Sequence, residues 1–207
     1  KIMAKKLESN FINMVVVLFS ISLIASAGVG YVYTLTKGPI EKAAQDKQQA
    51  AISNVLPGEF DNDPAAEKWT KEIDGGILEF YPAKHNGKSI GTAVKTFSNN
   101  GFNGYIEIMV GFNPDGSIND YSALINKETP GLGSKMNFWF REGNPGNVKG
   151  KTTGTTGLKV SKDGGDVDAI TAATISSRAF LDAINRAASA LNGADASSGA
   201  TQQNNQQ

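Results

Sequence analysis

The sequence predicts an α+β protein, in which a single N-terminal transmembrane helix is followed by one domain built on an antiparallel sheet. Three patterns indicate this class. Residues 11–33 form an uncharged apolar run, residues 77–125 contain short alternating segments separated by turn residues, and residues 175–191 carry apolar side chains at helical spacing. The 207 residues are enough for one domain of ordinary size and a membrane anchor.

The apolar run is the first expected element. No residue between Glu8 and Lys37 is charged, and residues 11–33 as a helix would cross the bilayer core, roughly 30 Å thick, at ~1.5 Å per residue. A cleaved signal peptide is the alternative, because the Ala-Ser-Ala at 25–27 resembles a cleavage site. The run continues to Tyr33, farther than a signal peptide needs, so we expect an uncleaved span.

The charges before the span predict its orientation. Lys1, Lys5 and Lys6 precede it, so the positive-inside rule places a short N-terminus, residues 1–10, in the cytoplasm. The remainder of the chain is then expected on the extracytoplasmic (periplasmic) side of the inner membrane.

A helical stalk is expected at residues 34–57, because Pro39 suits the first turn of a helix and is followed by Ala, Gln, Lys and Glu. The folded domain is expected at residues 58–192 and would begin with an irregular stretch over 59–75. Residues 193–207 consist largely of Ser, Ala, Gln and Asn, a composition typical of a disordered tail.

The domain is expected to contain an antiparallel meander and one C-terminal helix. Turn residues at 85–87 and 113–116 separate alternating segments. The expected strands are 77–81, 89–97, 105–112, 117–125 and a short one at 158–161, and the expected amphipathic helix is 175–191.

Composition excludes several classes of chemistry. The chain has no cysteine and one histidine, which excludes disulfides, thiolate zinc sites, cysteine-ligated iron–sulfur clusters, cysteine nucleophiles and multi-histidine metal sites. His85 lies in an Asn-Gly turn and is expected to be solvated. The formal net charge is zero, so no basic field suited to nucleic acid is present. We therefore predict no metal site and no catalytic residue.

Two segments are candidates for a binding site. In the first, residues 126–133, glycines on both sides of Leu132 let the main chain approach a flat ligand, and Pro-Gly suits the centre of a type II turn. The second, residues 168–178, carries four hydroxyls where the C-terminal helix begins, and the first N–H groups of a helix can bind a phosphate. An ordinary loop and a plain helix cap are the respective alternatives.

Together with Gly-Phe-Asn-Gly-Tyr at 101–105, these segments resemble the FMN-binding domain shared by the G subunit of the Rnf complex and the C subunit of the sodium-translocating NADH:quinone reductase. The Glu-Thr-Pro-Gly-Leu-Gly string at 128–133 is the most specific part. The chain length and the Lys-Lys-Leu-Glu-Ser at 5–9 look more like the Rnf protein.

The resemblance implies a membrane-anchored, covalent-FMN electron-transfer subunit of an ion-translocating ferredoxin:NAD oxidoreductase, which would not be catalytic alone. Its implied partners are the other subunits of that complex and, for maturation, a flavin transferase. The C subunit of the quinone reductase is the nearest alternative, and a membrane-tethered binding module without a redox role is the alternative of a different class.

The resemblance also implies the site residues. Thr174 would be the phosphoester acceptor of FMN. Flavin contacts are implied for Phe102, Asn103 and Gly104, for Glu128, Thr129, Leu132 and Gly133, and for Thr171, Ala172, Ala173, Ile175, Ser176 and Ser177.

The chain departs from the family pattern at two positions. Ala172 stands where glycine is usual, which is tolerable at negative φ and costly at positive φ. Asn126 replaces a common histidine. A second stretch, residues 195–201, matches the literal attachment motif and ends in Thr201, but no helix is expected after it to hold a phosphate, so we expect attachment at Thr174.

Overall fold

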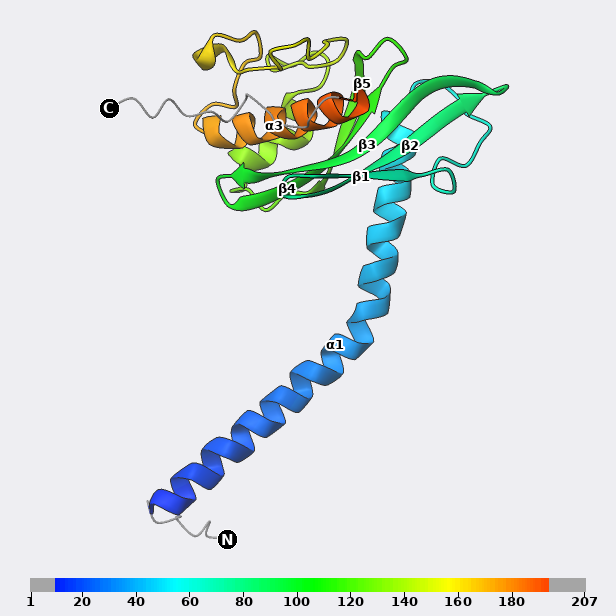
Figure 1. Ribbon diagram of the computed structural model, residues 1–207. Coiled ribbons are helices and arrows are strands. Elements are labelled where there is room, and N and C mark those ends of the chain that lie inside the picture. The colour runs from blue at the N-terminus through cyan, green and yellow to red at the C-terminus, as the bar shows by residue number, and fades with distance from the viewer. Residues whose placement is uncertain (1–9, 194–207) are drawn as a thin grey trace. The chain divides into compact units, whose positions relative to one another are not determined.

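The computed structural model describes residues 10–193, which fall into two compact units, one ending at Asp46 and one beginning at Lys47 (Figure 1). The first unit is the greater part of helix α1 (Phe11–Val55). The second contains a five-stranded antiparallel sheet and helix α3 (Thr174–Leu191), which confirms the predicted α+β class.

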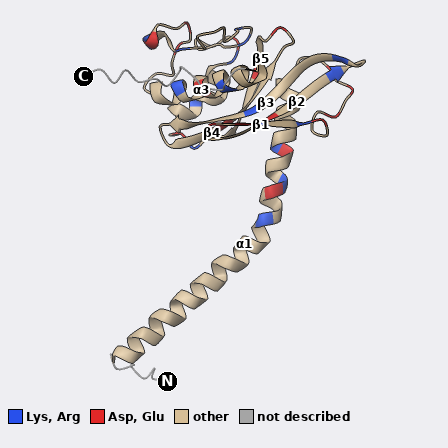
Figure 2. Ribbon diagram, viewed as in Figure 1, with Lys and Arg blue, Asp and Glu red and all other residues tan. Residues whose placement is uncertain are grey.

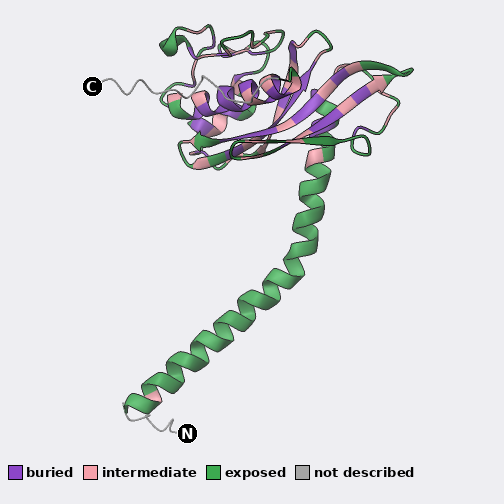
Figure 3. Ribbon diagram, in the orientation of Figure 1, coloured by how far each residue is buried: buried purple, intermediate pink, exposed green. Residues whose placement is uncertain are grey.

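Helix α1 contains both the predicted span and the predicted stalk. It is continuous through Pro39, so this proline lies inside the helix and does not begin a second one. The segment that contains the apolar run bears no charge until Lys37 (Figure 2), and its side chains are almost all exposed (Figure 3). Its length and composition allow it to cross a membrane. A lipid environment would cover the apolar side chains that the protein itself leaves exposed.

The sheet is a meander in which each strand pairs with the next, in the order β1-β2-β3-β4-β5. Two-residue turns join β2 to β3 and β3 to β4. In the first, Asn86 and Gly87 both have positive φ, as a type I′ hairpin turn requires. The strands are β1 (Trp69–Ile73), β2 (Gly76–His85), β3 (Lys88–Gly101), β4 (Gly104–Phe112) and β5 (Ile118–Ile125).

Two expectations about strands were wrong. Strand β1 lies within residues 59–75, which were expected to be irregular; it is a short edge strand whose side chains are mostly exposed, so it carries little alternation. The strand expected at 158–161 is absent. Val160 forms an isolated parallel bridge with Val167, and the chain continues into a 3-10 turn, η2 (Ser161–Asp163).

Helices cover both faces of the sheet within the second unit. Helix α3 packs on one face in the main core, which includes Phe80, Phe97 and Phe180. The last turns of α1 pack on the other face, where Ile52 and Val55 belong to a smaller core. Short helical segments, η1 (Gly133–Lys135) and α2 (Met136–Trp139), follow β5.

A glycine permits the close approach of α1 to the sheet. A Cβ at Gly111 on β4 would lie 1.9 Å from the Val55 carbonyl oxygen. The compact unit therefore begins inside the expected stalk, before the expected boundary at residue 58.

Candidate functional site

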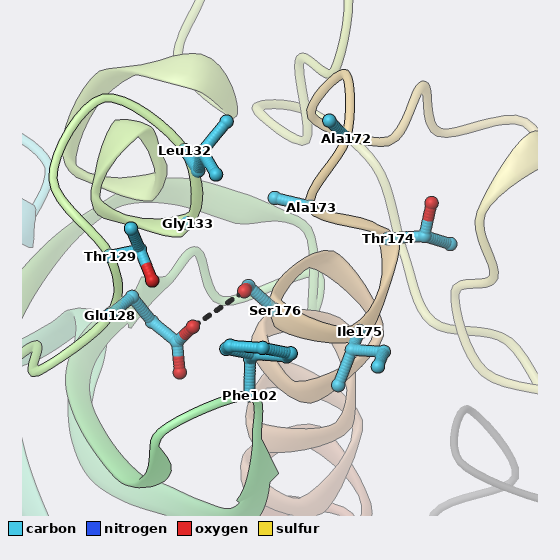
Figure 4. A pocket seen from close by; sticks show the side chains of 10 residues that line it. All are labelled: Phe102, Glu128, Thr129, Leu132, Gly133, Ala172, Ala173, Thr174, Ile175 and Ser176. Atoms are coloured by element: carbon cyan, nitrogen blue, oxygen red, sulfur yellow. Dashed lines mark hydrogen bonds between the residues drawn. The ribbon is translucent and has the colours of Figure 1, made fainter.

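A cavity of about 330 Å³ lies where three segments meet: the β3–β4 turn, the loop after β5, and the start of α3 (Figure 4). This volume is at the lower end of the range for small-molecule sites, ~300–1,000 Å³. All of its lining residues are among those that the family resemblance implies for the cofactor site. They are Phe102, Glu128, Thr129, Leu132, Gly133, Ala172, Ala173, Thr174, Ile175 and Ser176.

Glu128 joins the three segments. Its side chain is buried, Ser176 Oγ donates to Oε2 at 2.7 Å, and the Asn103 backbone N–H donates to Oε1 at 3.1 Å. A carboxylate that accepts bonds from a turn and a helix fixes both relative to its own loop. Figure 4 shows the bond between Glu128 and Ser176 among the side chains that line the cavity.

Two glycines leave room for this carboxylate. A Cβ at Gly101 would lie 2.6 Å from Glu128 Oε1, and one at Gly133 would lie 2.7 Å from Oε2 and 2.4 Å from Ser176 Oγ. Because protein interiors do not tolerate such overlap, these positions require glycine for close packing.

The loop at 126–133 contains the predicted type II turn. Gly131 has φ +77°, and the Leu132 N–H donates to the Thr129 carbonyl at 3.1 Å. Asn126, the residue found in place of the family histidine, has a structural role here. Its Oδ1 accepts from the Glu128 N–H at 3.0 Å, and its Nδ2 donates to Asn137 Oδ1 at 3.0 Å.

Helix α3 begins at Thr174 without a side-chain cap. Its first intrahelical bond runs from the Ser177 N–H to the Ala173 carbonyl at 3.0 Å. Within residues 10–193, the N–H groups of Thr174, Ile175 and Ser176 have no hydrogen-bond acceptor. Open N–H groups and the positive end of the helix dipole favour an anion at this position.

The resemblance implies cofactor contacts for the two serines that follow, but their hydroxyl protons are used elsewhere. Ser176 donates to Glu128, and Ser177 donates to the Ala173 carbonyl at 3.0 Å while accepting from the Ile170 N–H at 2.9 Å. Ser177 therefore shapes the turn before α3 and does not line the cavity.

Three other expected residues lie outside the cavity lining. Thr171 is exposed, Gly104 begins β4, and Asn103 acts through its bond to Glu128. Thr201 and its motif lie outside the described residues.

Ala172 adopts a conformation that an L-residue tolerates poorly. Its φ is +61°, in the left-handed region where glycine is usual. Alanine in place of the family glycine therefore strains the backbone at this position, two residues before Thr174.

Apolar side chains at the rim of the cavity are unusually exposed. Phe102 is 66%, Ile175 45% and Leu132 40% exposed. In Figure 4, Phe102 and Ile175 lie on one side of the cavity, and Leu132 and Ala172 lie on the other. A flat apolar ligand between them would remove this surface from water.

Sequence reasoning missed Lys162. The Thr174 side chain is half-buried, and its Oγ1 accepts a hydrogen bond from Lys162 Nζ at 3.4 Å. Lys162 lies on η2, twelve positions earlier in the chain. No periodicity or short motif links the two residues, and only the fold brings them together.

All three segments of the cavity lie within one stretch that matches a known family. Residues 101–189 match the family model of the FMN-binding domain. The chain is also 30% identical over 173 residues to the G subunit of the ion-translocating oxidoreductase complex of Vibrio cholerae, covering 79% of this chain and 82% of that protein.

Two further relatives agree. The corresponding protein of Aliivibrio fischeri strain MJ11 is 34% identical over 188 residues, covering 84% of this chain and 86% of the relative. The G subunit of the Na(+)-translocating ferredoxin:NAD(+) oxidoreductase complex of Acetobacterium woodii is 31% identical over 179 residues, covering 82% and 86% respectively.

Proposed function

The chain belongs to the family of G subunits of ion-translocating oxidoreductase complexes, and from this premise we propose that its cavity holds FMN attached covalently to Thr174. The chain is a membrane-anchored FMN-binding subunit that serves electron transfer within such a complex. The observation that carries the proposed attachment is the Thr174 hydroxyl, which lies at an uncapped helix N-terminus beside an apolar cavity.

The residues present fit this cofactor. When bound, FMN supplies the capacity to accept and release single electrons. Phe102, Leu132 and Ile175 would cover its rings and exclude water, since these side chains are exposed without a ligand. The open N–H groups of residues 174–176 would stabilise the phosphate charge.

Attachment would make Thr174 a phosphoester in a maturation step. In this step the Thr174 Oγ–H bond breaks, and Oγ forms a bond to the flavin-side phosphorus of FAD. The pyrophosphate P–O bond breaks, AMP leaves, and the hydroxyl proton passes to water. A flavin transferase would catalyse the step. Thr174 would then hold the cofactor during turnover and have no catalytic role.

The proposed topology places residues 1–10 in the cytoplasm and the FMN-binding domain on the periplasmic side. The lysines before the span support this orientation. Because the chain has no cysteine, a Lys88→Cys variant would carry the only thiol. Labelling of that thiol in intact cells by a membrane-impermeant maleimide is expected, and labelling only after lysis would contradict the topology.

The named relatives favour the Rnf-type complex over the NADH:quinone reductase. The relatives described above are G subunits, and the Acetobacterium woodii protein is named for ferredoxin:NAD(+) chemistry. We therefore propose that the other subunits of such a complex are the partners of this chain.

Flavin fluorescence of the denatured protein tests the attachment. The full chain is co-expressed with a flavin transferase, separated by denaturing electrophoresis, and mapped by peptide mass. Fluorescence is expected for the wild type and for Thr201→Ala, which removes the hydroxyl of the second motif. It is expected to disappear in Thr174→Ala.

Two outcomes would overturn the assignment. One is the absence of fluorescence from the wild type when the transferase is active on a known substrate. The other is FMN mass on the peptide that contains Thr201. Expression without the transferase is the control for non-enzymatic labelling.

A further inference from the structure

We propose that Lys162 is the positioning residue for the phosphate on Thr174, an inference that rests on the proposed function. Its ammonium would pair with the phosphate charge and hold the attached group at the mouth of the cavity. This assigns a role to a residue outside the cavity lining and outside the glycine loops.

The first support is the contact itself. Lys162 Nζ lies 3.4 Å from Thr174 Oγ1, the atom that would become the ester oxygen. A lysine ammonium has three donors, and this hydroxyl uses one. The non-bridging oxygens of a phosphate attached to Oγ1 would lie next to Lys162 Nζ, and they would accept hydrogen bonds from its two other N–H groups.

The second support is the fixed position of the turn that carries Lys162. Arg178 on α3 makes a two-bond pair with Asp163 on η2, at 2.7 Å from Nε and 2.6 Å from Nη2. Ser161 Oγ donates to the Val167 carbonyl at 3.0 Å and also contacts Asp168 Oδ1 at 2.6 Å. The backbone of Lys162 is therefore tied to the helix whose first residue is Thr174.

The third support is the local charge balance. Asp163 is neutralised chiefly by Arg178, whose hydrogen bonds hold the pKa of that carboxyl below its usual range. Asp166 pairs with Lys151. Lys162 contributes only a weaker electrostatic interaction to Asp163. Within residues 10–193, its hydrogen-bond partner is the neutral hydroxyl of Thr174, so its charge remains available to an anion there.

A purely structural role for Lys162 accounts poorly for these facts. The side chain is exposed and its contact with a hydroxyl is long. Such contacts contribute little to folding stability. A phosphodiester on Thr174 would convert the contact into a charge-assisted pair, which is shorter and stronger.

Lysine acylation in the loaded and unloaded wild-type chain tests the inference directly. Loaded protein, with FMN mass verified on the Thr174 peptide, is compared with protein expressed without the transferase. We expect acylation of Lys162 to slow at least about threefold on loading, because a paired ammonium is less often deprotonated and free. Lys88, in the β2–β3 hairpin, is the internal control, and its acylation rate should be the same in the loaded and the unloaded protein.

Equal rates at Lys162, with FMN verified on Thr174, would overturn the inference and leave the proposed function standing. FMN mass absent from the Thr174 peptide would overturn both. The two failures are therefore distinguishable in one set of spectra.

Three variants give an independent readout in the transferase reaction with FAD. Lys162→Gln is expected to lower kcat/KM about tenfold, because it removes about one charge-assisted hydrogen bond. Lys162→Arg retains the positive charge, so its kcat/KM should stay within about threefold of the wild-type value. Lys88→Gln is the matched control and should behave as wild type. An equal fall in kcat/KM for Lys162→Arg and Lys162→Gln would contradict the positioning role of Lys162, and so would an unchanged kcat/KM for Lys162→Gln. Circular dichroism confirms that each variant is folded.

Discussion

Replacing Ala172 with glycine should stabilise the domain. Ala172 has φ +61°, a conformation that costs an L-residue ~1–2 kcal/mol. Glycine removes this cost but loses ~0.5–1 kcal/mol more backbone entropy on folding. The alanine methyl is exposed, so deleting it sacrifices little burial. We expect a net gain of about 0.5–1 kcal/mol in the free energy of unfolding.

Thermal unfolding of the full chain in detergent, followed by fluorescence of Trp69 and Trp139, measures this change. The midpoint temperature should rise by about 2 °C, as expected for a domain of this size. Ala66→Gly is the matched control: Ala66 is exposed, its φ is not positive, and the variant should lose stability. Equal destabilisation in the two variants would refute the strain assigned to Ala172.

Two further predictions concern packing and charge. Gly133→Ala should destabilise by about 1–3 kcal/mol in the same assay, because the new methyl would overlap Glu128 and Ser176; wild-type stability would contradict that packing. Burial opposes ionisation of Glu79, but hydrogen bonds from Tyr81, Lys95 and Lys68 outweigh it and lower its pKa from 4.5 to about 2. The stability contributed by its charge is fully present above about pH 5 and is lost as the pH falls toward 2. The stability difference from Glu79→Gln should shrink over that interval, and a constant difference would exclude this linkage.

The elements with strong periodicity could be predicted from sequence. Strands β2 to β4 carry buried apolar side chains between turn residues, β5 buries Ile118 and Tyr121, and α3 has a long amphipathic pattern. Strand β1 could not be predicted because both its faces are largely exposed, so burial imposes no pattern on it. The segment at 158–161 resembled a strand, yet it forms one isolated bridge, between Val160 and Val167, before the chain turns at Gly164, whose φ is +80°.

The lining of the cavity was predictable for a different reason. Its residues lie in three short segments that carry the resemblance to the FMN-binding domain, and two of these segments, 126–133 and 168–178, also have a local signature of glycines or hydroxyls. The roles of individual atoms were not predictable. Ser176 donates to Glu128, from a distant part of the chain, and Lys162 reaches Thr174 through the pairing of Asp163 with Arg178. Such contacts depend on tertiary packing, which no local pattern encodes.

The burial of the last turns of α1 determines where the chain can be shortened. A soluble fragment designed from sequence would begin at the Pro57-Gly58 pair, where the helical pattern stops. That fragment would lack residues 51–55, which cover Tyr81 and Met109 on one face of the sheet. The uncovered face would promote aggregation. A cut ahead of Lys47 keeps this cover. A flavin domain released from its anchor must therefore retain the last turns of α1.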